Sequence, residues 1–344
     1  MMRSDYARVD TGFRGACGVP EDDMTQTISA LGGVPVVDMN DWRGEDAEVR
    51  AAFVKAVGEA LEEYGFLRVR GHSVTPEIVA PAYGVARALF ALSEEQKNAY
   101  CVRGGHGERG YTPFGAEHAK GTPMPDLKEF WHVGRELEEG HPLRSVYPPN
   151  QWPTEVSGFR EAMLNLYDAL EDVAKDMLEV VARYLGEPPH CLTRLSIDGN
   201  SILRALHYPP LGDIPVVKGA VRAAAHEDIN LITLLVTSTQ SGLEILRRDG
   251  QWLAVDAEPG EILMDAGDML ARITNGVLGA TTHRVVNPSE DRSERFSMPF
   301  FVHPRPEALL SVLDSCRRPD LPEPATDITG YAFLRERLAE IGLA

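Results

Sequence analysis

The second half of the chain contains a series of short runs rich in β-branched and aromatic residues, each bounded by turn-forming residues. Asp249-Gly250 and Asn275-Gly276 are two of these boundaries, and both dipeptides tolerate the positive φ of tight hairpins. The runs lie at 201–208, 231–237, 243–246, 252–255, 261–265, 269–274, 282–286 and 295–303. Eight runs at this spacing predict an antiparallel sandwich or barrel, best described as a jelly roll.

The first half shows helical spacing instead. Apolar residues recur every fourth position, at Val49, Phe53, Val57 and Leu61, and Gly65 follows them as a C-cap. Helices are predicted at 45–64, 76–92, 93–99, 153–185 and 331–341, and short strands at 34–38 and 66–69. The Gly-, Pro- and His-rich stretch at 102–153 predicts loops and short strands that cover a functional region.

Together these patterns predict an α+β chain in four parts. We expect a flexible N-terminal arm at 1–30, an α-rich region at 31–195, a β-core at 196–306 and a C-terminal helical segment at 307–344, with helices flanking the core. Met24 stands just before the first structured segment and is a candidate for the native start.

Charge excludes several functional classes. The 34 Lys and Arg residues against 52 Asp and Glu residues leave a formal net charge of −18, which disfavours nucleic acids and anionic membranes as partners. No apolar run approaches a membrane span, and the N-terminus lacks the apolar core of a secretory signal, so we expect a cytoplasmic protein. The four cysteines, Cys17, Cys101, Cys191 and Cys316, show no CxxC spacing and are expected to be reduced thiols.

Two histidines and one carboxylate have the types that a non-haem iron site requires. His226 and Asp228 are two residues apart, so an extended segment would direct both side chains to the same side. His283 follows 55 positions after Asp228, on another predicted strand. Two histidines and one carboxylate form the facial triad of Fe(II) oxygenases and leave coordination positions open. The H-x-D triplet alone is a weak signal, because such triplets occur by chance.

Arg295 and Ser297 follow the second histidine and share one face of a predicted strand. A guanidinium and a hydroxyl in this arrangement can bind one carboxylate together. The alternative for Arg295 is a surface ion pair with Glu290, Asp291 or Glu294.

These residues form part of a longer ordered pattern. Its elements are His226-x-Asp228, Gly242-Leu243, Asp249-Gly250-x-Trp252, Pro259-Gly260, Gly267-Asp268, Thr274-Asn275-Gly276, His283-Arg284-Val285 and Arg295-x-Ser297. Upstream lie Val34-Pro35-Val36-Val37-Asp38 and Tyr64-Gly65-Phe66. From about residue 34 to 306 the chain resembles the isopenicillin N synthase-like branch of the 2-oxoglutarate/Fe(II)-dependent dioxygenases. The set in this order is specific, whereas each element alone is not.

The resemblance implies a distorted double-stranded β-helix, a jelly roll, with iron at its open end. It implies that His226, Asp228 and His283 bind Fe(II), and that 2-oxoglutarate chelates this iron through its 1-carboxylate and 2-oxo groups. Arg295 and Ser297 would hold the 5-carboxylate, and Tyr208 matches a tyrosine that contacts this co-substrate. Leu206 departs from the asparagine common in plant members, and Tyr208 could equally be a core tyrosine.

The resemblance further implies the reaction. Decarboxylation of 2-oxoglutarate with O2 would give succinate, CO2 and an Fe(IV)-oxo species, which would hydroxylate, desaturate or cyclise a small-molecule substrate. Some relatives with the Arg-x-Ser pair are direct oxidases of the isopenicillin N synthase type or use ascorbate, so these remain alternatives. A non-catalytic jelly-roll binding protein and a zinc hydrolase with the same ligands are rivals from other classes. The sequence names neither the substrate nor the oligomeric state.

Residues expected to cover the iron provide candidates for the substrate pocket. These are Tyr111, Phe114, Phe130, Trp131, Arg135 and Phe301. The aromatic residues would form apolar walls, with ordinary core packing as the alternative. Arg135 would bind a substrate carboxylate, with a surface pair to Glu138 or Glu139 as its alternative.

Overall fold

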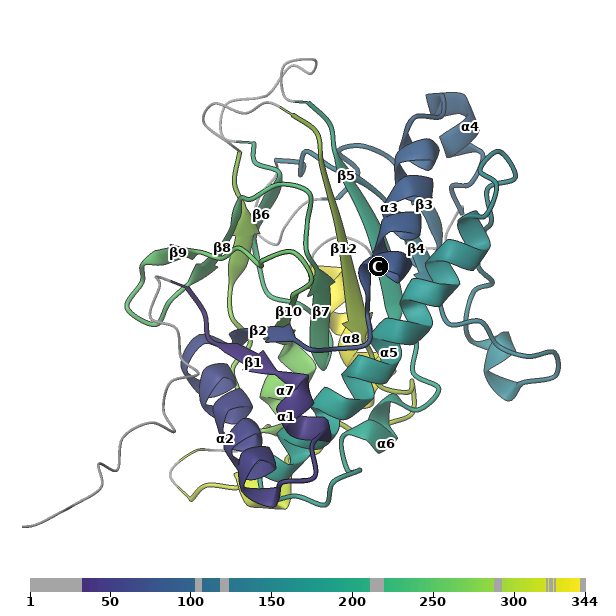
Figure 1. The fold of residues 1–344 in the computed structure, drawn as a ribbon. Coiled ribbons are helices and arrows are strands. Elements are labelled where there is room, and N and C mark those ends of the chain that lie inside the picture. The colour runs from purple at the N-terminus through teal and green to yellow at the C-terminus, as the bar shows by residue number, and fades with distance from the viewer. Residues whose placement is uncertain are drawn as a thin grey trace, which may run out of the picture.

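Two β-sheets with helices packed around them make up the structure, a computed structural model (Figure 1). It describes residues 33–102, 107–117, 124–210, 220–287, 293–319, 321, 324 and 326–340. The predicted arm at 1–30 and Met24 lie outside the described residues. Helices combined with a β-core confirm the predicted α+β class.

The larger sheet has eight strands and contains strands from both halves of the chain. Its spatial order is β1 (Val36–Asp38), β2 (Phe66–Arg70), β10 (Ile262–Ala266), β7 (Ile232–Val236), β12 (Arg295–Val302), β5 (Ile202–Tyr208), β4 (Glu129–Gly134) and β3 (Gly110–Thr112). β1 and β2 are parallel, and the other neighbours are antiparallel. The first four strands of the chain therefore extend the sheet of the C-terminal core on both sides.

The smaller sheet places two distant segments next to each other. Its order is β6 (Ala223–His226), β11 (His283–Val285), β8 (Leu243–Leu246) and β9 (Trp252–Ala254). In its antiparallel register, His283 lies opposite His226. β6 was not among the predicted strands, because its three alanines carry no β-branched signal before His226.

Side chains along β12 point alternately to the two faces of the larger sheet, and these faces have different surroundings. Phe300 contacts Tyr167 of helix α5 (Phe159–Tyr184), with ring centroids 4.8 Å apart, so this face packs against helices. Arg295, Ser297 and Phe301 point to the other face, because side chains two residues apart on a strand share a side. This second face is directed toward the smaller sheet, and the candidate site lies between the two sheets.

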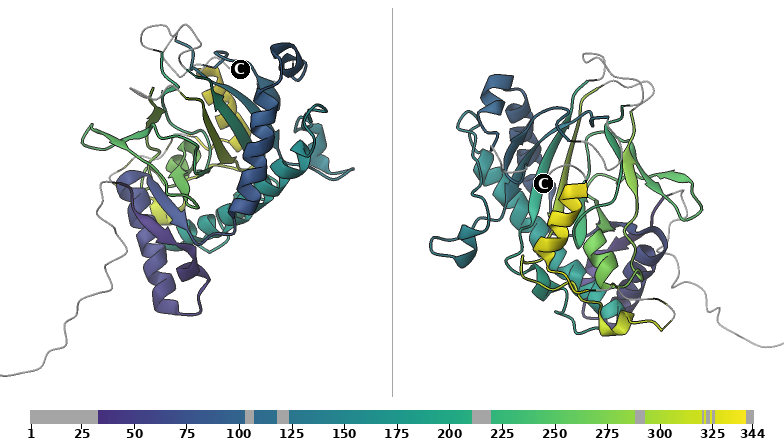
Figure 2. Two further views of the ribbon diagram at one scale, coloured as in Figure 1. Left: turned by 45° about the horizontal axis from the view of Figure 1, so that its top comes forward. Right: turned by 180° about the vertical axis from the view of Figure 1, so that it is seen from behind.

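The remaining helices are short, apart from α2 and α3. They are α1 (Met39–Arg43), α2 (Ala47–Tyr64), α3 (Pro76–Phe90), α4 (Glu94–Asn98), α6 (Thr193–Ser196), α7 (Asp268–Ile273) and α8 (Gly330–Glu340), with 3-10 turns at Pro142–Ser145 and Asp314–Cys316. Seen from behind in Figure 2, α8 lies on the side of the larger sheet away from α5. Among the described helices, none combines the length and apolar character that crossing a membrane requires.

Two helix ends have the capping residues that their sequences predict. Gly65 ends α2 with φ of 65°, and its N–H donates to Leu61 O. Ser93 begins α4 with a capping box, in which the Ser93 hydroxyl and the Gln96 side chain each accept a backbone N–H from the other residue. The long helix α5 begins at Phe159 rather than at 153, because Gly158 stands before it with φ of 75° in the left-handed region.

The predicted strand at 269–274 is wrong, since this segment is the helix α7. Its buried residues are Met269, Leu270 and Ile273. The spacing i, i+1, i+4 fits one face of a helix and not the alternation of a strand. The segment is short, apolar and bounded by turns, so its length could not distinguish a helix from a strand.

Candidate active site

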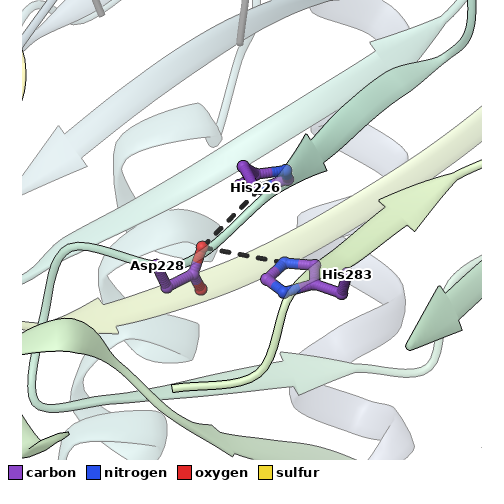
Figure 3. A group of neighbouring side chains, drawn as sticks. All are labelled: His226, Asp228 and His283. Atoms are coloured by element: carbon purple, nitrogen blue, oxygen red, sulfur yellow. Dashed lines mark ion pairs between the residues drawn. The ribbon is translucent and has the colours of Figure 1, made fainter. Parts of the chain in front are cut away.

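The predicted triad comes together at the edge of the smaller sheet. His226 ends β6, Asp228 follows two residues later, and His283 begins β11. The Nε2 atoms of both histidines lie 3.7 Å from Asp228 Oδ1 (Figure 3). One ligand atom from each residue lies within 4.8 Å of the other two. Two imidazole nitrogens and one carboxylate oxygen in this arrangement form a donor set suited to Fe(II).

Both histidines are oriented by backbone carbonyls. His226 Nδ1 lies 2.8 Å from Ala224 O, and His283 Nδ1 lies 3.1 Å from Thr281 O. A carbonyl can only accept, so in this assignment each Nδ1 carries the proton and each Nε2 presents its lone pair to the centre. Burial and the neighbouring His283 lower the pKa of His226 to about 4, which keeps the ring in the neutral form that binds metals.

Asp228 is held so that only one of its oxygens faces the histidines. The Thr233 hydroxyl donates to Asp228 Oδ2, and Asn230 Nδ2 donates to Thr233 Oγ1 at 2.8 Å. The backbone is clamped as well, because the N–H of Asp268 donates to Asp228 O at 2.8 Å. A Cβ at Gly267 would collide with Asn230, which explains why glycine stands at this close approach.

The predicted carboxylate anchor lies on β12 and β5. Arg295 is opposite Tyr208 in the antiparallel register, and its guanidinium carbon lies 5.0 Å from the Tyr208 ring centroid. Ser297 is two residues along the same face and is buried. Glu294, one alternative partner of Arg295, lies instead 3.3 Å from the His207 ring.

The Arg295 guanidinium is itself suited to an incoming carboxylate. Arg295 is only 1% exposed. Its Nε donates to Gln240 O at 3.0 Å, whereas Nη1 is buried and has no hydrogen-bond partner among the described residues. Leaving a buried charged donor unpaired is costly, so this atom identifies a position where an anion such as the 5-carboxylate of 2-oxoglutarate fits.

A cavity of about 590 Å³ opens beside the triad and has His226 and Asp228 in its wall. Among the predicted substrate-pocket residues, Tyr111, Phe130 and Phe301 line it. α8 contributes Leu334, Arg337 and Leu338 to the wall. This volume is within the range of pockets that bind small molecules.

Three predicted pocket residues do not line this cavity. Trp131 is fully buried on the helix-facing side of β4, with its ring centroid 5.4 Å from that of Phe159. Arg135 donates hydrogen bonds to Glu171 of α5 and, at 2.8 Å, to Gly199 O. Its guanidinium therefore stabilises the fold instead of entering the cavity. Phe114 is 39% exposed. The alternation of β4, which separates Trp131 from Phe130, could have shown that these two do not share one wall.

The sequence analysis did not predict the charged residues in the cavity wall. Lys128 lies 2.7 Å from both Glu117 and Asp126, and Arg204 lies 3.3 Å from Glu117. The Arg204 guanidinium carbon is 4.2 Å from the Phe130 ring centroid. Lys128 directly precedes β4 and is two residues before Phe130, so the same alternation, continued by one residue, would have placed it in the wall.

Comparisons with known proteins agree with this site. Residues 34–155 match the model of the non-haem dioxygenase in morphine synthesis N-terminal region, and residues 199–304 match the 2OG-Fe(II) oxygenase superfamily. The chain is 32% identical to a 2-oxoglutarate-Fe(II) type oxidoreductase of Emericella nidulans, over 82% of each sequence. A 2OG-Fe(II) oxygenase family protein of Caulobacter crescentus is similar in structure, with a TM-score of 0.81 and 39% identity over 90% of this chain and 99% of that one. A Neurospora crassa protein in complex with alpha-KG and thymine has a TM-score of 0.80 and 25% identity, over 91% and 98% of the two chains.

The fold and the family matches together define a non-haem dioxygenase with a jelly-roll core. The chain belongs to the 2OG-Fe(II) oxygenase superfamily, which confirms the predicted family. It is an oxidoreductase that uses Fe(II), 2-oxoglutarate and O2.

Proposed function

We propose that His226, Asp228 and His283 hold Fe(II) and that Arg295, with Ser297 and Tyr208, holds the 5-carboxylate of 2-oxoglutarate. A small molecule bound in the cavity beside the triad is then hydroxylated, desaturated or cyclised. The observation that carries this proposal is the meeting of the three ligand atoms, within 4.8 Å of one another, at a cavity that has two of the three residues, His226 and Asp228, in its wall.

Bound Fe(II) supplies the redox chemistry that couples decarboxylation of 2-oxoglutarate, to succinate and CO2, with oxidation of the substrate. The contribution of the chain is to position the reactants and to exclude water. Thr233 and the backbone N–H of Asp268 hold Asp228, while Ala224 O and Thr281 O hold the two imidazoles. Apolar wall residues such as Phe130 and Phe301 limit solvent around the reacting bond.

The dimensions and lining of the cavity support a small-molecule substrate. A volume of about 590 Å³ accommodates a compound of one or two rings and is too small for a folded partner. The similar Neurospora crassa protein has been crystallised with thymine, a compound of this size. The wall contains both ion pairs and aromatic rings, so the substrate we propose has both an apolar skeleton and polar substituents.

An anaerobic binding experiment tests the proposed roles. Apo-protein is mixed with Fe(II), then with 2-oxoglutarate, and the visible charge-transfer band of the chelate is recorded. We expect the band in the wild type, and its loss in His226→Ala. His190→Ala is the matched control, since the His190 side chain is 67% exposed.

Each result of this experiment has a defined meaning. Iron binding without the band in the wild type would favour the direct oxidases, in which the substrate itself meets the iron. A band that persists in His226→Ala would contradict the proposed ligand set. Once the band is established, succinate release on addition of small molecules identifies the substrate.

A further inference from the structure

Arg109, in the wall of the same cavity, is a buried cation that pairs with no carboxylate in the part of the chain that the structure describes. We propose that it binds an anionic group of the substrate, and that the substrate class is therefore small carboxylic acids. This inference rests on the proposed function, in that the cavity beside the triad is taken as the substrate site. It adds the substrate group that the cavity is built to hold.

The backbone gives Arg109 access to the inner face of the larger sheet. Its guanidinium lies over Gly134, the last residue of β4, and a Cβ at Gly134 would overlap the guanidinium carbon. Gly134 follows Phe130 and His132 on the side of β4 that faces the cavity. The guanidinium therefore occupies the position that a side chain of residue 134 would take in this wall.

The carboxylates of Glu108 and Glu136 act on Arg109 only at longer range than an ion pair. Arg109 is 1% exposed, and it forms no ion pair with any carboxylate of the described residues. Its hydrogen bonds go to neutral oxygens, from Nη1 to Glu108 O at 2.7 Å and from Nη2 to Asn200 Oδ1 at 2.6 Å. Its Nε is buried, and no described residue accepts a hydrogen bond from it. A buried guanidinium with neutral partners alone favours the entry of an anion.

The other cations in the wall are already paired, which makes Arg109 distinct. Lys128 has Glu117 and Asp126, and Arg204 has Glu117. The remaining cation of this wall, Arg337 of α8, lies 3.3 Å from Asp268. An anionic substrate would have to displace an internal carboxylate at these three positions, but not at Arg109.

Two further residues complete the anion site. His303 lines the cavity and is 8% exposed, and its buried Nδ1 has no hydrogen-bond partner within the described ranges. Asn200 also lines the cavity, and because its Oδ1 accepts from Arg109, its amide N–H groups are directed elsewhere and are available to a ligand. Guanidinium, imidazole and amide donors together match the acceptor oxygens of a carboxylate.

Matched acids and amides test this inference while the natural substrate is still unidentified. The probes are benzoate with benzamide, and cyclohexanecarboxylate with its carboxamide, added at saturating 2-oxoglutarate so that Arg295 is occupied. Binding is followed by the change in the charge-transfer band and by the shift in unfolding midpoint. We expect the acid of each pair to bind the wild type at least ten-fold more tightly than its amide.

Two variants separate an anion site from a structural arginine. Asn200→Asp places a carboxylate beside Arg109 Nη2, so it should raise the unfolding midpoint without probe and abolish the preference for acids. Asn40→Asp, on an exposed position of α1, adds the same charge and should keep that preference. Arg109→Met should also lose it. A preference for acids that survives in Asn200→Asp, or equal binding of acids and amides to the wild type, overturns the inference.

Failure of this inference is distinguishable from failure of the proposed function. An intact charge-transfer band with no acid binding, or no acid preference, refutes the role of Arg109 and leaves the iron site standing. A missing band in the wild type refutes the proposed co-substrate site instead. In that case the acid-dependent midpoint shift, compared between wild type and Asn200→Asp, still decides whether Arg109 binds anions.

Discussion

Thr233 is the side chain that most directly controls Asp228, and replacing it by valine isolates that control. Valine has nearly the shape of threonine but no hydroxyl, so its main effect is to remove the hydrogen bond to Asp228 Oδ2. It also removes the acceptor of the Asn230 Nδ2 hydrogen bond, which is 2.8 Å long. Thr233 is 3% exposed, so water cannot replace either contact freely.

Two independent estimates give the size of the effect on metal binding. A hydrogen bond to a charged group contributes about 1.5–3 kcal/mol, which corresponds to roughly a 10- to 100-fold change in affinity. Removing a group that orients a metal ligand typically costs about 10- to 100-fold in affinity. We therefore expect Thr233→Val to weaken Fe(II) binding by about 10- to 100-fold. The unpaired Asn230 donor should lower the free energy of unfolding by about 1–3 kcal/mol.

The assay is anaerobic calorimetric titration of apo-protein with Fe(II), combined with urea unfolding of the same samples. Thr233→Ser is the control, because it keeps the hydroxyl and should bind iron close to the wild type. If Thr233→Val binds Fe(II) as tightly as wild type while remaining folded, the hydroxyl does not position Asp228. If serine and valine lose affinity equally, packing and not hydrogen bonding explains the loss.

Three further predictions concern other parts of the site. Arg295→Met should raise the half-saturating concentration of 2-oxoglutarate by about 10- to 100-fold, with Fe(II) affinity nearly unchanged; parallel changes in both titrations would contradict the assigned role. Burial lowers the pKa of His303 to about 4 from 6.5, so the unfolded state binds an extra proton between these values. Stability should therefore fall by up to about 3 kcal/mol from pH 6.5 to pH 4, and His303→Gln should flatten this slope in urea unfolding. Gly134→Ala should cost about 1–3 kcal/mol in the same assay, because its methyl group overlaps the Arg109 guanidinium; an unchanged midpoint would show that Arg109 lies elsewhere.

Much of the core was predictable because turn chemistry and strand composition are local properties. Hairpin dipeptides such as Asp249-Gly250 mark where strands end, and Gly250 has the positive φ of 81° that this interpretation expects. β6 was missed, since Ala223, Ala224 and Ala225 have no local preference for a strand and gain it from pairing with β11. Tertiary pairing of this kind is invisible to a pattern of one segment.

The triad was easier to foresee than the cavity for a physical reason. His226 and Asp228 are two residues apart, so their relation depends on local geometry alone, and the structure brings them together with His283. The cavity wall depends on which face of each strand looks inward and on which loops cross it. Arg109 reaches the wall only because Gly134, 25 positions later, leaves room for it. No property of either residue alone indicates that arrangement.

β12 connects the two halves of the proposed site through one rigid element. Arg295 and Phe301 are six residues apart on the same face, which is roughly 20 Å along an extended strand. The anchor proposed for 2-oxoglutarate and the wall of the cavity therefore keep a constant separation. A slip of one residue would turn Arg295, Ser297 and Phe301 together toward α5, so the register that buries Phe296 and Phe300 also maintains both sites. Changes at the cavity end of β12 can then alter substrate preference without disturbing the co-substrate anchor, because the strand between them remains paired on both sides.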